Sequence, residues 1–283
     1  MTIGVDVGGT HIRIGTRTHI KEFDTPGADI PALIAEFMRE HGGDAVGVGI
    51  PGTLDRDCRV VLNTPNIPAL SGCKLADEIE RAAGVPCFLE NDTIMLMTGD
   101  LNRLEISPDG VILGVYIGTG LGSCVLIDGA PYCGVNGFGS ELGHIPLYGK
   151  SRKCGCGNFG CAEAYVSGSY LQALRAEKYP ATSIVDLFTV MDELDEYADA
   201  LAVTVATAVQ LFDPRVILIG GGVAAMRGFP LDKFKALLYT HTMKPLPAET
   251  LNVVTSASRP ETIPAGVLGA IIHAESKLAA LRT

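Results

Sequence analysis

Residues 4–10 read GVDVGGT, and residues 114–120 read GVYIGTG. In both stretches an apolar, strand-like run leads into a glycine-rich turn, and a second strand-like run follows, HIRIGT at 11–16 and LGSCVLI at 121–127. Two strand–turn–strand units of this kind predict a duplicated fold whose two lobes face each other across a cleft. Strand and helix patterns alternate along the rest of the chain, which places the fold in the α/β class.

The glycine turns are candidate phosphate-binding sites, because backbone amides without bulky side chains can approach an anion closely. One such turn is equally an ordinary tight hairpin, but two of them favour a bound nucleotide. Asp6 precedes the first turn and can hold a hydrated divalent cation, whereas Tyr116 stands in the matching place of the second copy. A third glycine run, after a predicted strand at 215–219, offers side-chain-free backbone to a nucleoside. The turn residues are Gly8, Gly9 and Thr10, then Gly118, Thr119 and Gly120, and finally Gly221 and Gly222.

Gly47, Gly49 and Gly52 spell the pattern G-x-G-x-x-G. A dinucleotide-binding fingerprint follows a strand and opens a helix. Here the glycines lie within the strand-like run AVGVGI at 45–50, and a second strand-like run, TLDRDCRVVL at 53–62, comes next. We therefore reject a dinucleotide site at this place.

Residues 141–163, ELGHIPLYGKSRKCGCGNFGCAE, contain one histidine and three cysteines in a glycine-rich segment. Three sulfurs and one imidazole can complete a tetrahedral zinc site, and C-x-C-x4-C with an upstream histidine is a metal-binding spacing. A disulfide cluster or unligated thiols are the alternatives. Glu141 and Glu163 bracket the ligands, so a bound metal would fix two carboxylates in the wall of a polar pocket. The four ligands would be His144, Cys154, Cys156 and Cys161.

Two further polar segments adjoin predicted strands or turns. Asn91 and Asp92 lie between a predicted strand at 85–89 and a predicted helix at about 93–102. Asp92 is either a helix cap or a general base at the carboxyl end of a strand, where open α/β sheets bind their ligands. In the loop NTPNIP at 63–68, two prolines hold the backbone extended and present Asn66 as donor and acceptor, unless the loop is only a solvated turn.

The bulk composition excludes several classes of protein. The chain has 283 residues, a net charge of −10 and a pI near 5.0, which argues against nucleic-acid and anionic-membrane partners. No apolar stretch reaches the roughly 18 residues of a membrane span, and the start, MTIGVDVGG, lacks a secretory pattern. We expect a cytoplasmic protein whose eight cysteines are reduced thiols, three of them committed to metal.

The segment EISPDG at 105–110 interrupts the strand and helix patterns, and we expect the hinge between the lobes there. The predicted domains are a smaller α/β lobe over residues 1–108 and a larger α/β lobe over residues 109–263. The larger lobe carries the zinc knuckle at 144–161. The predicted last helix, within 264–283, packs back on the first lobe.

The motifs together resemble the ROK family of sugar kinases, and the resemblance covers nearly the whole chain. Its most specific part is the ELGH and C-x-C-G-x-x-G-C-x-E block at 141–163. DVGGTHIR at 6–13, ENDT at 90–93, YIGTGLG at 116–122 and LFDPRVILIGGGV at 211–223 complete it. The resemblance implies a duplicated fold of the actin/hexokinase/Hsp70 (ribonuclease H-like) type.

The resemblance also implies an activity and the residues that serve it. The activity is ATP-dependent phosphorylation of the 6-hydroxyl of an aldohexose, with Asp92 as the catalytic base, Mg²⁺ on the nucleotide, a structural Zn²⁺ and a homodimer. Asp6 organises the magnesium, and the glycine turns named above bind ATP. His144 serves both the zinc and the sugar through its two ring nitrogens. The implied sugar ligands are Asn66, Asn91, Asp92, Glu141, His144 and Glu163.

Flanking segments refine the expected substrate. TPNIP at 64–68, GAPYCGVNG at 129–137 and the late FPLDKF…KPLP resemble D-allose kinases most. Glucokinase, mannokinase, fructokinase and N-acetylmannosamine kinase are the alternatives within the family. A non-catalytic sugar-responsive regulator is the alternative from another class, although family repressors carry a helix-turn-helix segment ahead of the first strand. Ser140 stands where the family usually has glycine, which puts the turn before Glu141 in question.

Overall fold

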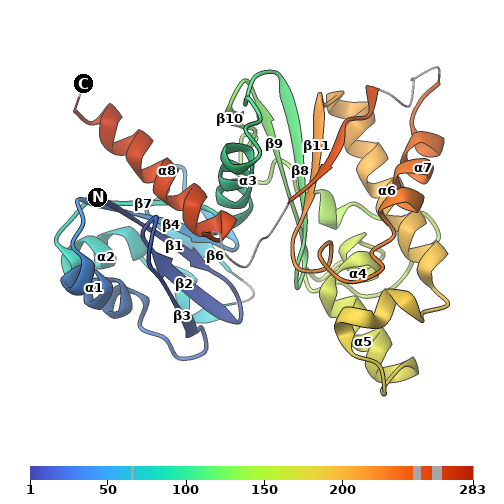
Figure 1. The fold of residues 1–283 in the computed structure, drawn as a ribbon, viewed down its shortest axis with the longest axis horizontal. Coiled ribbons are helices and arrows are strands. Elements are labelled where there is room, and N and C mark those ends of the chain that lie inside the picture. The colour runs from blue at the N-terminus through green and yellow to red at the C-terminus, as the bar shows by residue number, and fades with distance from the viewer. Residues whose placement is uncertain (65–66, 245–249, 257–262, 283) are drawn as a thin grey trace. The chain divides into compact units, whose positions relative to one another are not determined.

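The structure is a computed structural model that describes residues 1–64, 67–244, 250–256 and 263–282. These residues form two compact units, each built on its own β-sheet (Figure 1). Unit 1 comprises Met1–Ser107, Cys133–Phe138 and Ser258–Thr283, and unit 2 comprises Pro108–Tyr132 and Gly139–Ala257.

Unit 1 has a five-stranded sheet with the strand order β3-β2-β1-β4-β7. β1 runs antiparallel to β2 and parallel to β4, and β7 runs parallel to β4. The elements of unit 1 are β1 (Thr2–Val7), β2 (His11–Gly15), β3 (Ile20–Asp24), α1 (Ile30–His41), β4 (Ala45–Ile50), β5 (Thr53–Leu54), β6 (Val61–Asn63), η1 (Pro68–Leu70), α2 (Leu75–Ala83), β7 (Cys87–Asn91), α3 (Asp92–Arg103) and α8 (Ala265–Ala280).

Unit 2 has a five-stranded sheet with the strand order β10-β9-β8-β11-β12. β8 runs antiparallel to β9 and parallel to β11, and β12 runs parallel to β11. The elements of unit 2 are β8 (Val111–Ile117), β9 (Leu121–Ile127), β10 (Ala130–Pro131), η2 (Leu142–His144), α4 (Glu163–Val166), α5 (Gly168–Lys178), η3 (Ile184–Thr189), α6 (Leu194–Phe212), β11 (Val216–Gly220), α7 (Leu231–His241) and β12 (Val253–Thr255).

The two sheets have the same topology. In each, three antiparallel strands are followed by two strands parallel to the central one. β1 and β8, which carry the repeated GVDVGGT and GVYIGTG motifs, are the central strands. The predicted duplicated α/β fold is therefore confirmed.

Side chains of β1 alternate between two different environments. Ile3, Val5 and Val7 are fully buried and belong to a core shared with α1 and α2. The opposite face of β1 carries Gly4 and Asp6 and lies against α8 (Figure 1). A Cβ atom at Gly4 would collide with the carbonyl oxygen of Val267. The strand thus packs a conventional apolar core on one face and admits a helix at close range on the other.

The rejected G-x-G-x-x-G pattern has a packing function. A Cβ at Gly47 would collide with the Ala270 carbonyl oxygen, and a Cβ at Gly49 would lie 3.2 Å from the Met95 side chain. Gly52 has φ +123°, a conformation that disfavours other residues. Gly47 thus lets α8 approach β4, Gly49 lets α3 approach it, and a Cβ at Gly52 would collide with the Asn63 carbonyl oxygen.

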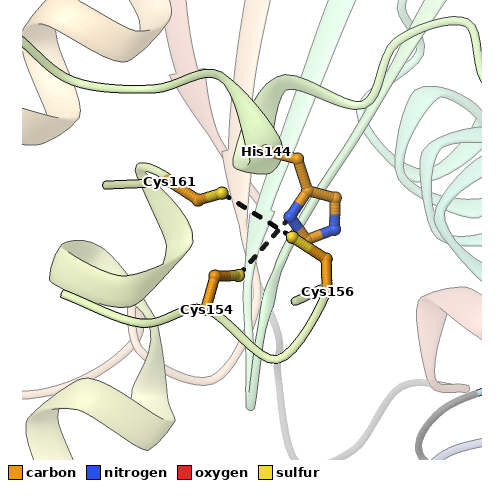
Figure 2. Close-up of side chains that lie close together, drawn as sticks. All are labelled: His144, Cys154, Cys156 and Cys161. Carbon is orange, nitrogen blue, oxygen red and sulfur yellow. Dashed lines mark hydrogen bonds between the residues drawn. The ribbon is translucent and has the colours of Figure 1, made fainter. Parts of the chain in front are cut away.

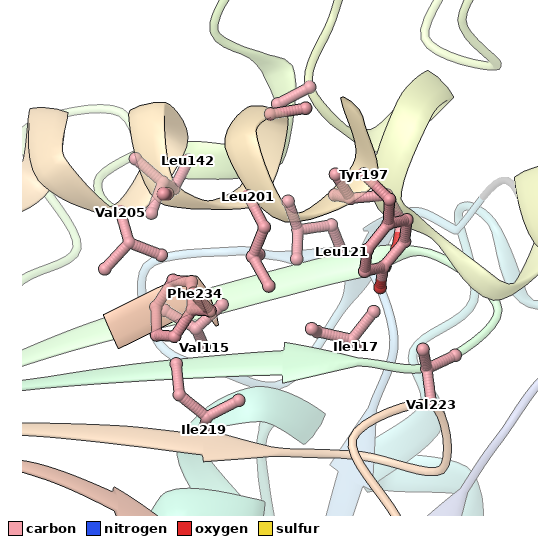
Figure 3. Close-up of a cluster of buried hydrophobic side chains, with 14 of the residues drawn as sticks. Val115, Ile117, Leu121, Leu142, Tyr197, Leu201, Val205, Ile219, Val223 and Phe234 are labelled. Atoms are coloured by element: carbon pink, nitrogen blue, oxygen red, sulfur yellow. The ribbon is translucent and has the colours of Figure 1, made fainter. Parts of the chain in front are cut away.

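The core of unit 2 lies between α6 and the sheet. Figure 3 shows Tyr197, Leu201 and Val205 of α6 pointing toward strand residues that include Val115 and Ile117, and all five side chains are at least 99% buried. The Tyr197 hydroxyl donates a hydrogen bond of 2.9 Å to the carbonyl oxygen of Val166. This bond satisfies the buried phenol and ties α6 to α4.

One predicted segment has a different structure. Residues 53–62, which the sequence pattern indicated as one strand, form a short hairpin of β5 and β6. The Asp55 carboxylate accepts the backbone N–H groups of Arg59 (2.7 Å) and Val60 (2.8 Å) and so stabilises the turn. Across the described ranges, none of the helices has the length and apolar character that a membrane crossing requires.

Candidate functional site

The first glycine turn joins β1 to β2 and is braced from one side by Thr25. The Thr25 hydroxyl donates to the Gly8 carbonyl oxygen (2.7 Å), and its backbone N–H donates to the Thr10 carbonyl oxygen (2.9 Å). Gly9 and Thr10 are exposed. The turn is therefore held in place and open to an anionic group.

Asp6 lies beside this turn, against the first turn of α8. A Cβ at Gly266 would lie 2.5 Å from Asp6 Cγ, so that only glycine leaves room for the carboxylate. Arg13 Nη1 lies 3.7 Å from Asp6 Oδ2. Burial raises the pKa of Asp6, and the positive charge of Arg13 opposes that rise. A carboxylate beside a turn that can hold phosphate is placed to hold a hydrated divalent cation, with Arg13 as a competing positive charge.

Asn91 and Asp92 lie where β7 ends and α3 begins. Asn91 caps the helix: its Oδ1 accepts the Thr93 backbone N–H (2.9 Å), and its Nδ2 donates to the Gly52 carbonyl oxygen (3.2 Å). Asp92 Oδ1 also accepts the Thr93 backbone N–H, at 2.8 Å. The capping role that the sequence left open for Asp92 is thus filled mainly by Asn91, and Asp92 is the first helical residue.

The register of the sheet places these groups on one edge of unit 1. Asp6 pairs with Gly49 of β4, and the neighbouring Ile50 pairs with Asn91 of β7. β1, β4 and β7 are parallel, so their carboxyl ends meet at the same edge of the sheet, two strand spacings or about 10 Å apart. Asp6, the first glycine turn and Asp92 therefore share that edge.

In unit 2 two glycine turns meet at the corresponding edge of the second sheet. β8 and β11 are parallel neighbours, with Tyr116 paired to Gly220. Gly221 has φ +93°, and a Cβ there would collide with the backbone of Ile117, which precedes the turn at 118–120. Around Gly118 and Gly222, by contrast, a Cβ would meet open space. Side-chain-free backbone from both turns is therefore accessible at this edge.

The four predicted zinc ligands converge in unit 2 (Figure 2). Their ligand atoms all lie within 4.8 Å of one another. Cys156 Sγ lies 3.7 Å from Cys161 Sγ, and Cys154 Sγ lies 3.7 Å from His144 Nδ1. Zinc–sulfur bonds of about 2.3 Å in a tetrahedron place sulfur atoms about 3.8 Å apart, so the cluster has the dimensions of a zinc site.

The thiols of the cluster differ in acidity. Burial raises the pKa of Cys154 to about 12 and also raises the pKa of Cys161, whereas a backbone hydrogen bond from Asn158 lowers the pKa of Cys156. Cysteine binds metal as a thiolate, so metal binding would displace the remaining protons. Three thiolates and one imidazole form the donor set that zinc prefers.

Of the two predicted carboxylates that flank the cluster, Glu141 lies beside His144 and Glu163 lies beside the second glycine turn. Glu141 is half exposed, and its Oε2 lies 3.9 Å from His144 Nε2, the ring nitrogen that faces away from Cys154. Burial raises the pKa of Glu141, an effect that His144 opposes and Glu163 reinforces. Glu163 Oε2 accepts the backbone N–H of Leu121 at 2.9 Å, directly after the second glycine turn.

The predicted site residues thus fall into one group on each unit. Unit 1 holds the magnesium-organising and base candidates, and unit 2 holds the metal cluster, both bracketing acids and two glycine turns. Asn66 lies outside the described residues. The sequence reasoning missed Thr25, Gly266 and Ser169, which contact the site residues from other elements. Their residue types are common, and only the fold brings them to the site.

Comparisons with known proteins identify relatives over nearly the whole chain. A model of the ROK family matches residues 2–277. The chain is 30% identical to the N-acetyl-D-glucosamine kinase of Aliivibrio salmonicida over 89% of this chain and 91% of that protein. It is 30% identical to the glucokinase of Thermotoga maritima over 95% of each.

A solved structure shows the same arrangement of elements. The ROK family glucokinase from Streptomyces griseus, in complex with glucose and AMPPNP, matches with a TM-score of 0.81 and 27% identity, over 97% of this chain and 99% of that chain. The family model and these relatives cover most of the sequence. The chain therefore belongs to the ROK family.

Proposed function

We propose that the protein is an ATP-dependent kinase that phosphorylates the 6-hydroxyl of an aldohexose. The observation that carries the proposal is the shared edge of the unit 1 sheet, where Asp6, the first glycine turn and Asp92 lie together. The relatives named above, an N-acetyl-D-glucosamine kinase and a glucokinase, support the same class of substrate.

Asp92 is the proposed general base. Its hydrogen bonds to Thr93 restrict the carboxylate, which lies at the N-terminus of α3, where a negative charge is stabilised. An alcohol attacks a phosphoryl group well when a carboxylate accepts its proton, and such catalysis contributes roughly 10²–10⁴-fold. Asp92 would take the proton of the sugar hydroxyl as the hydroxyl oxygen bonds to the γ-phosphorus of ATP and the bond from that phosphorus to the β–γ bridging oxygen breaks, which releases ADP.

The glycine turns and Asp6 are the proposed nucleotide site. The turns Gly8–Thr10 and Gly118–Gly120 would bind phosphate oxygens. The N–H groups of Gly8 and Gly118 already donate to the carbonyl oxygens of His11 (2.9 Å) and Gly120 (3.0 Å), so the later residues of each turn would supply the donors. Gly221 and Gly222 would lie beside the adenosine. Mg²⁺ neutralises the charge that develops on the phosphates when it is bound. Asp6, whose side chain is 15% exposed beside the first turn, is the residue that would hold it.

The Cys–His cluster is the proposed site of a structural Zn²⁺. Its donor set and its distances fit that ion, which holds loops rigidly through tetrahedral coordination. Glu141, His144 and Glu163 would then present fixed polar atoms to sugar hydroxyls, together with Asn66, Asn91 and Asp92. An unpaired buried polar group costs about 1–3 kcal/mol, which is enough to distinguish epimers.

D-Allose is the substrate that we propose within this class, on the resemblance of the flanking segments at 64–68, 129–137 and 229–247. Glucose and N-acetylglucosamine, the substrates in the names of the relatives, are the main competitors. A coupled assay of ADP release with D-allose, D-glucose, D-mannose, D-fructose, N-acetylglucosamine and N-acetylmannosamine tests both levels of the proposal.

The expected result is sugar-dependent ADP release with the highest kcat/KM for D-allose. A higher kcat/KM for another hexose would overturn the assignment of D-allose but leave the kinase. Sugar binding without ADP release on any hexose would contradict the kinase and favour a sugar-responsive regulator.

A further inference from the structure

The segment that follows the Cys–His cluster in sequence forms hydrogen bonds with the second glycine turn. The backbone N–H of Gly168 donates to the Gly118 carbonyl oxygen (2.8 Å), and both the N–H (3.0 Å) and the hydroxyl (2.8 Å) of Ser169 donate to the Thr119 carbonyl oxygen. Glu163 Oε2 accepts the N–H of the residue that follows the turn, Leu121. These four hydrogen bonds come from a stretch of seven residues, 163–169.

Glu163 lies between the metal ligands and this turn. It follows Cys161 by two residues, and its Oε1 lies 3.6 Å from Cys154 Sγ. Its Oε2 fits closely on the turn, because a Cβ at Gly120 would lie 2.5 Å from that oxygen. The Cys154 thiol donates to Oε1 only while it is protonated, so with metal bound the link from the cluster to this carboxylate runs through the backbone from Cys161.

The segment at the other end of the cluster, Leu142–His144, contacts β9, the strand that follows the second glycine turn. Gly143, which precedes the ligand His144, lies so close to Leu121 that a Cβ would collide with the Leu121 carbonyl oxygen. The Leu142 backbone N–H donates to the hydroxyl of Ser123 at 3.1 Å. The start of β9 is thus held by the segments at both ends of the cluster, and a metal that joins His144 to Cys161 would fix both segments around it.

We propose that Glu163 is a positioning residue for the nucleotide in addition to being a sugar ligand. Through Leu121 it holds the turn at 118–120 in its phosphate-binding conformation, and metal occupancy of the Cys–His cluster holds Glu163 in place. The inference rests on the proposed function, since it assigns this turn to ATP. It adds a link between the metal cluster and nucleotide affinity.

The test measures the Kd of Mg²⁺–AMPPNP without sugar, by isothermal titration calorimetry, together with the zinc content. Glu163→Ala should weaken nucleotide binding about 10-fold, because a backbone N–H loses a charged acceptor. Glu163→Gln should stay within about 3-fold of the wild type, because its amide oxygen can still accept the Leu121 N–H. Glu141→Ala is the matched control, since this acid flanks the cluster without contacting the turn.

Sugar affinity separates the two roles of Glu163. Glu163→Ala and Glu141→Ala should both weaken sugar binding, whereas only Glu163→Ala should weaken nucleotide binding. Removing zinc from the wild type with a chelator should lower nucleotide affinity to the level of Glu163→Ala and leave that variant nearly unchanged, because both changes act through the same contact.

Equal nucleotide affinity of the wild type and Glu163→Ala would overturn the positioning role and leave the kinase proposal intact. Loss of nucleotide affinity in Glu141→Ala to the same extent would also overturn it, since the effect would then follow from removing either acid beside the cluster and not from the contact with the turn. A wild-type protein that binds no AMPPNP would contradict the proposed function itself, and the inference with it.

Discussion

Ser140 has a backbone conformation that usually belongs to glycine. Its φ is +71°, and it immediately precedes Glu141, in the turn that the sequence comparison with the family put in question. The Ser140 hydroxyl donates to the Tyr132 carbonyl oxygen at 3.2 Å, and its own carbonyl oxygen accepts the N–H of Leu142 at 2.8 Å. The turn that glycine would make is therefore kept, with the conformational strain of a side chain in the left-handed region.

Replacing Ser140 by glycine and by alanine isolates this strain. Both variants lose the hydroxyl bond to Tyr132, so their difference reports the cost of a Cβ at φ +71°. Ser140→Gly should have a free energy of unfolding about 1 kcal/mol above that of Ser140→Ala, measured by urea denaturation. An alanine variant as stable as the glycine variant would show that the turn is not strained.

His273 of α8 is a partly buried histidine. Burial, and secondarily the positive charge of Lys277, lowers its pKa from 6.5 to about 4. Its Nε2 is buried and has no hydrogen-bond partner within the described part of the chain. The folded protein therefore holds a neutral imidazole, whereas the unfolded chain binds a proton below about pH 6.5.

Because of His273, the free energy of unfolding should accordingly decrease as the pH is lowered. The stabilisation is complete above the unfolded pKa of 6.5 and is lost as the pH falls toward 4, because the unfolded state then binds the extra proton. Between pH 7 and pH 5 the wild type should lose about 2 kcal/mol more than His273→Gln, measured by urea denaturation. His19→Gln, at an exposed histidine, is the control and should keep the pH dependence of the wild type. Identical pH profiles for the wild type and His273→Gln would contradict the buried neutral state.

At the scale of elements, glycines determine how closely α3 and α8 pack. A Cβ at Gly269 of α8 would collide with the carbonyl oxygen of Met95 in α3. A Cβ at Gly99 of α3 would collide with the backbone of Ala265 in α8. The helices therefore cross with backbone almost in contact, and neither position has room for a methyl group.

Gly269→Ala should destabilise unit 1 although alanine is the better helix former. The added methyl meets backbone, which cannot rotate away, so the free energy of unfolding should fall by about 2–3 kcal/mol. Ser276→Ala, on the exposed face of the same helix, is the control and should change it little. A thermal melt in which Gly269→Ala is as stable as the wild type would refute the close crossing.

The Cys–His cluster is the element that a metal would complete. Cys156→Ser should reduce bound zinc and lower zinc affinity at least about 10-fold, because a hydroxyl replaces a thiolate in a set of four ligands. Sugar affinity should fall in the same variant. Cys73→Ser, outside the cluster, is the control for elemental analysis of zinc. Full zinc occupancy in Cys156→Ser would remove Cys156 from the ligand set.

Most elements were predictable because their signals are local. Hydrophobic periodicity gave the strands and helices, and the repeated glycine motif gave the duplication. The hairpin at 53–63 was not predicted, because Asp55 turns the chain through hydrogen bonds to backbone N–H groups, which an apolar pattern of side chains does not reveal. The spacing of the cysteines predicted the cluster, because its ligands are close in sequence. The contact of Gly266 with Asp6 could not be predicted, since the two residues are 260 positions apart in the sequence.

At the scale of the molecule, duplication supplies two sheets with equivalent edges and different residues. The central strand carries Asp6 in one unit and Tyr116 in the other. Tyr116 packs on Gly220, where a Cβ would lie 2.7 Å from the tyrosine ring, so the second copy has exchanged an acid for an aromatic side chain. One unit thus carries the acidic groups proposed for cation binding and proton transfer, and the other carries the metal cluster. A homodimer remains a prediction, which sedimentation in solution would test.

The most direct test of the kinase proposal compares the wild type with Asp92→Asn. The measurement is sugar 6-phosphate formed from ATP and the preferred hexose, quantified by ³¹P NMR, alongside the Kd of the sugar. The wild type should form the 6-phosphate, and Asp92→Asn should bind sugar within a few-fold but react roughly 10²–10⁴-fold more slowly, because no carboxylate accepts the hydroxyl proton. An Asp92→Asn protein that phosphorylates the sugar at the wild-type rate would contradict the account.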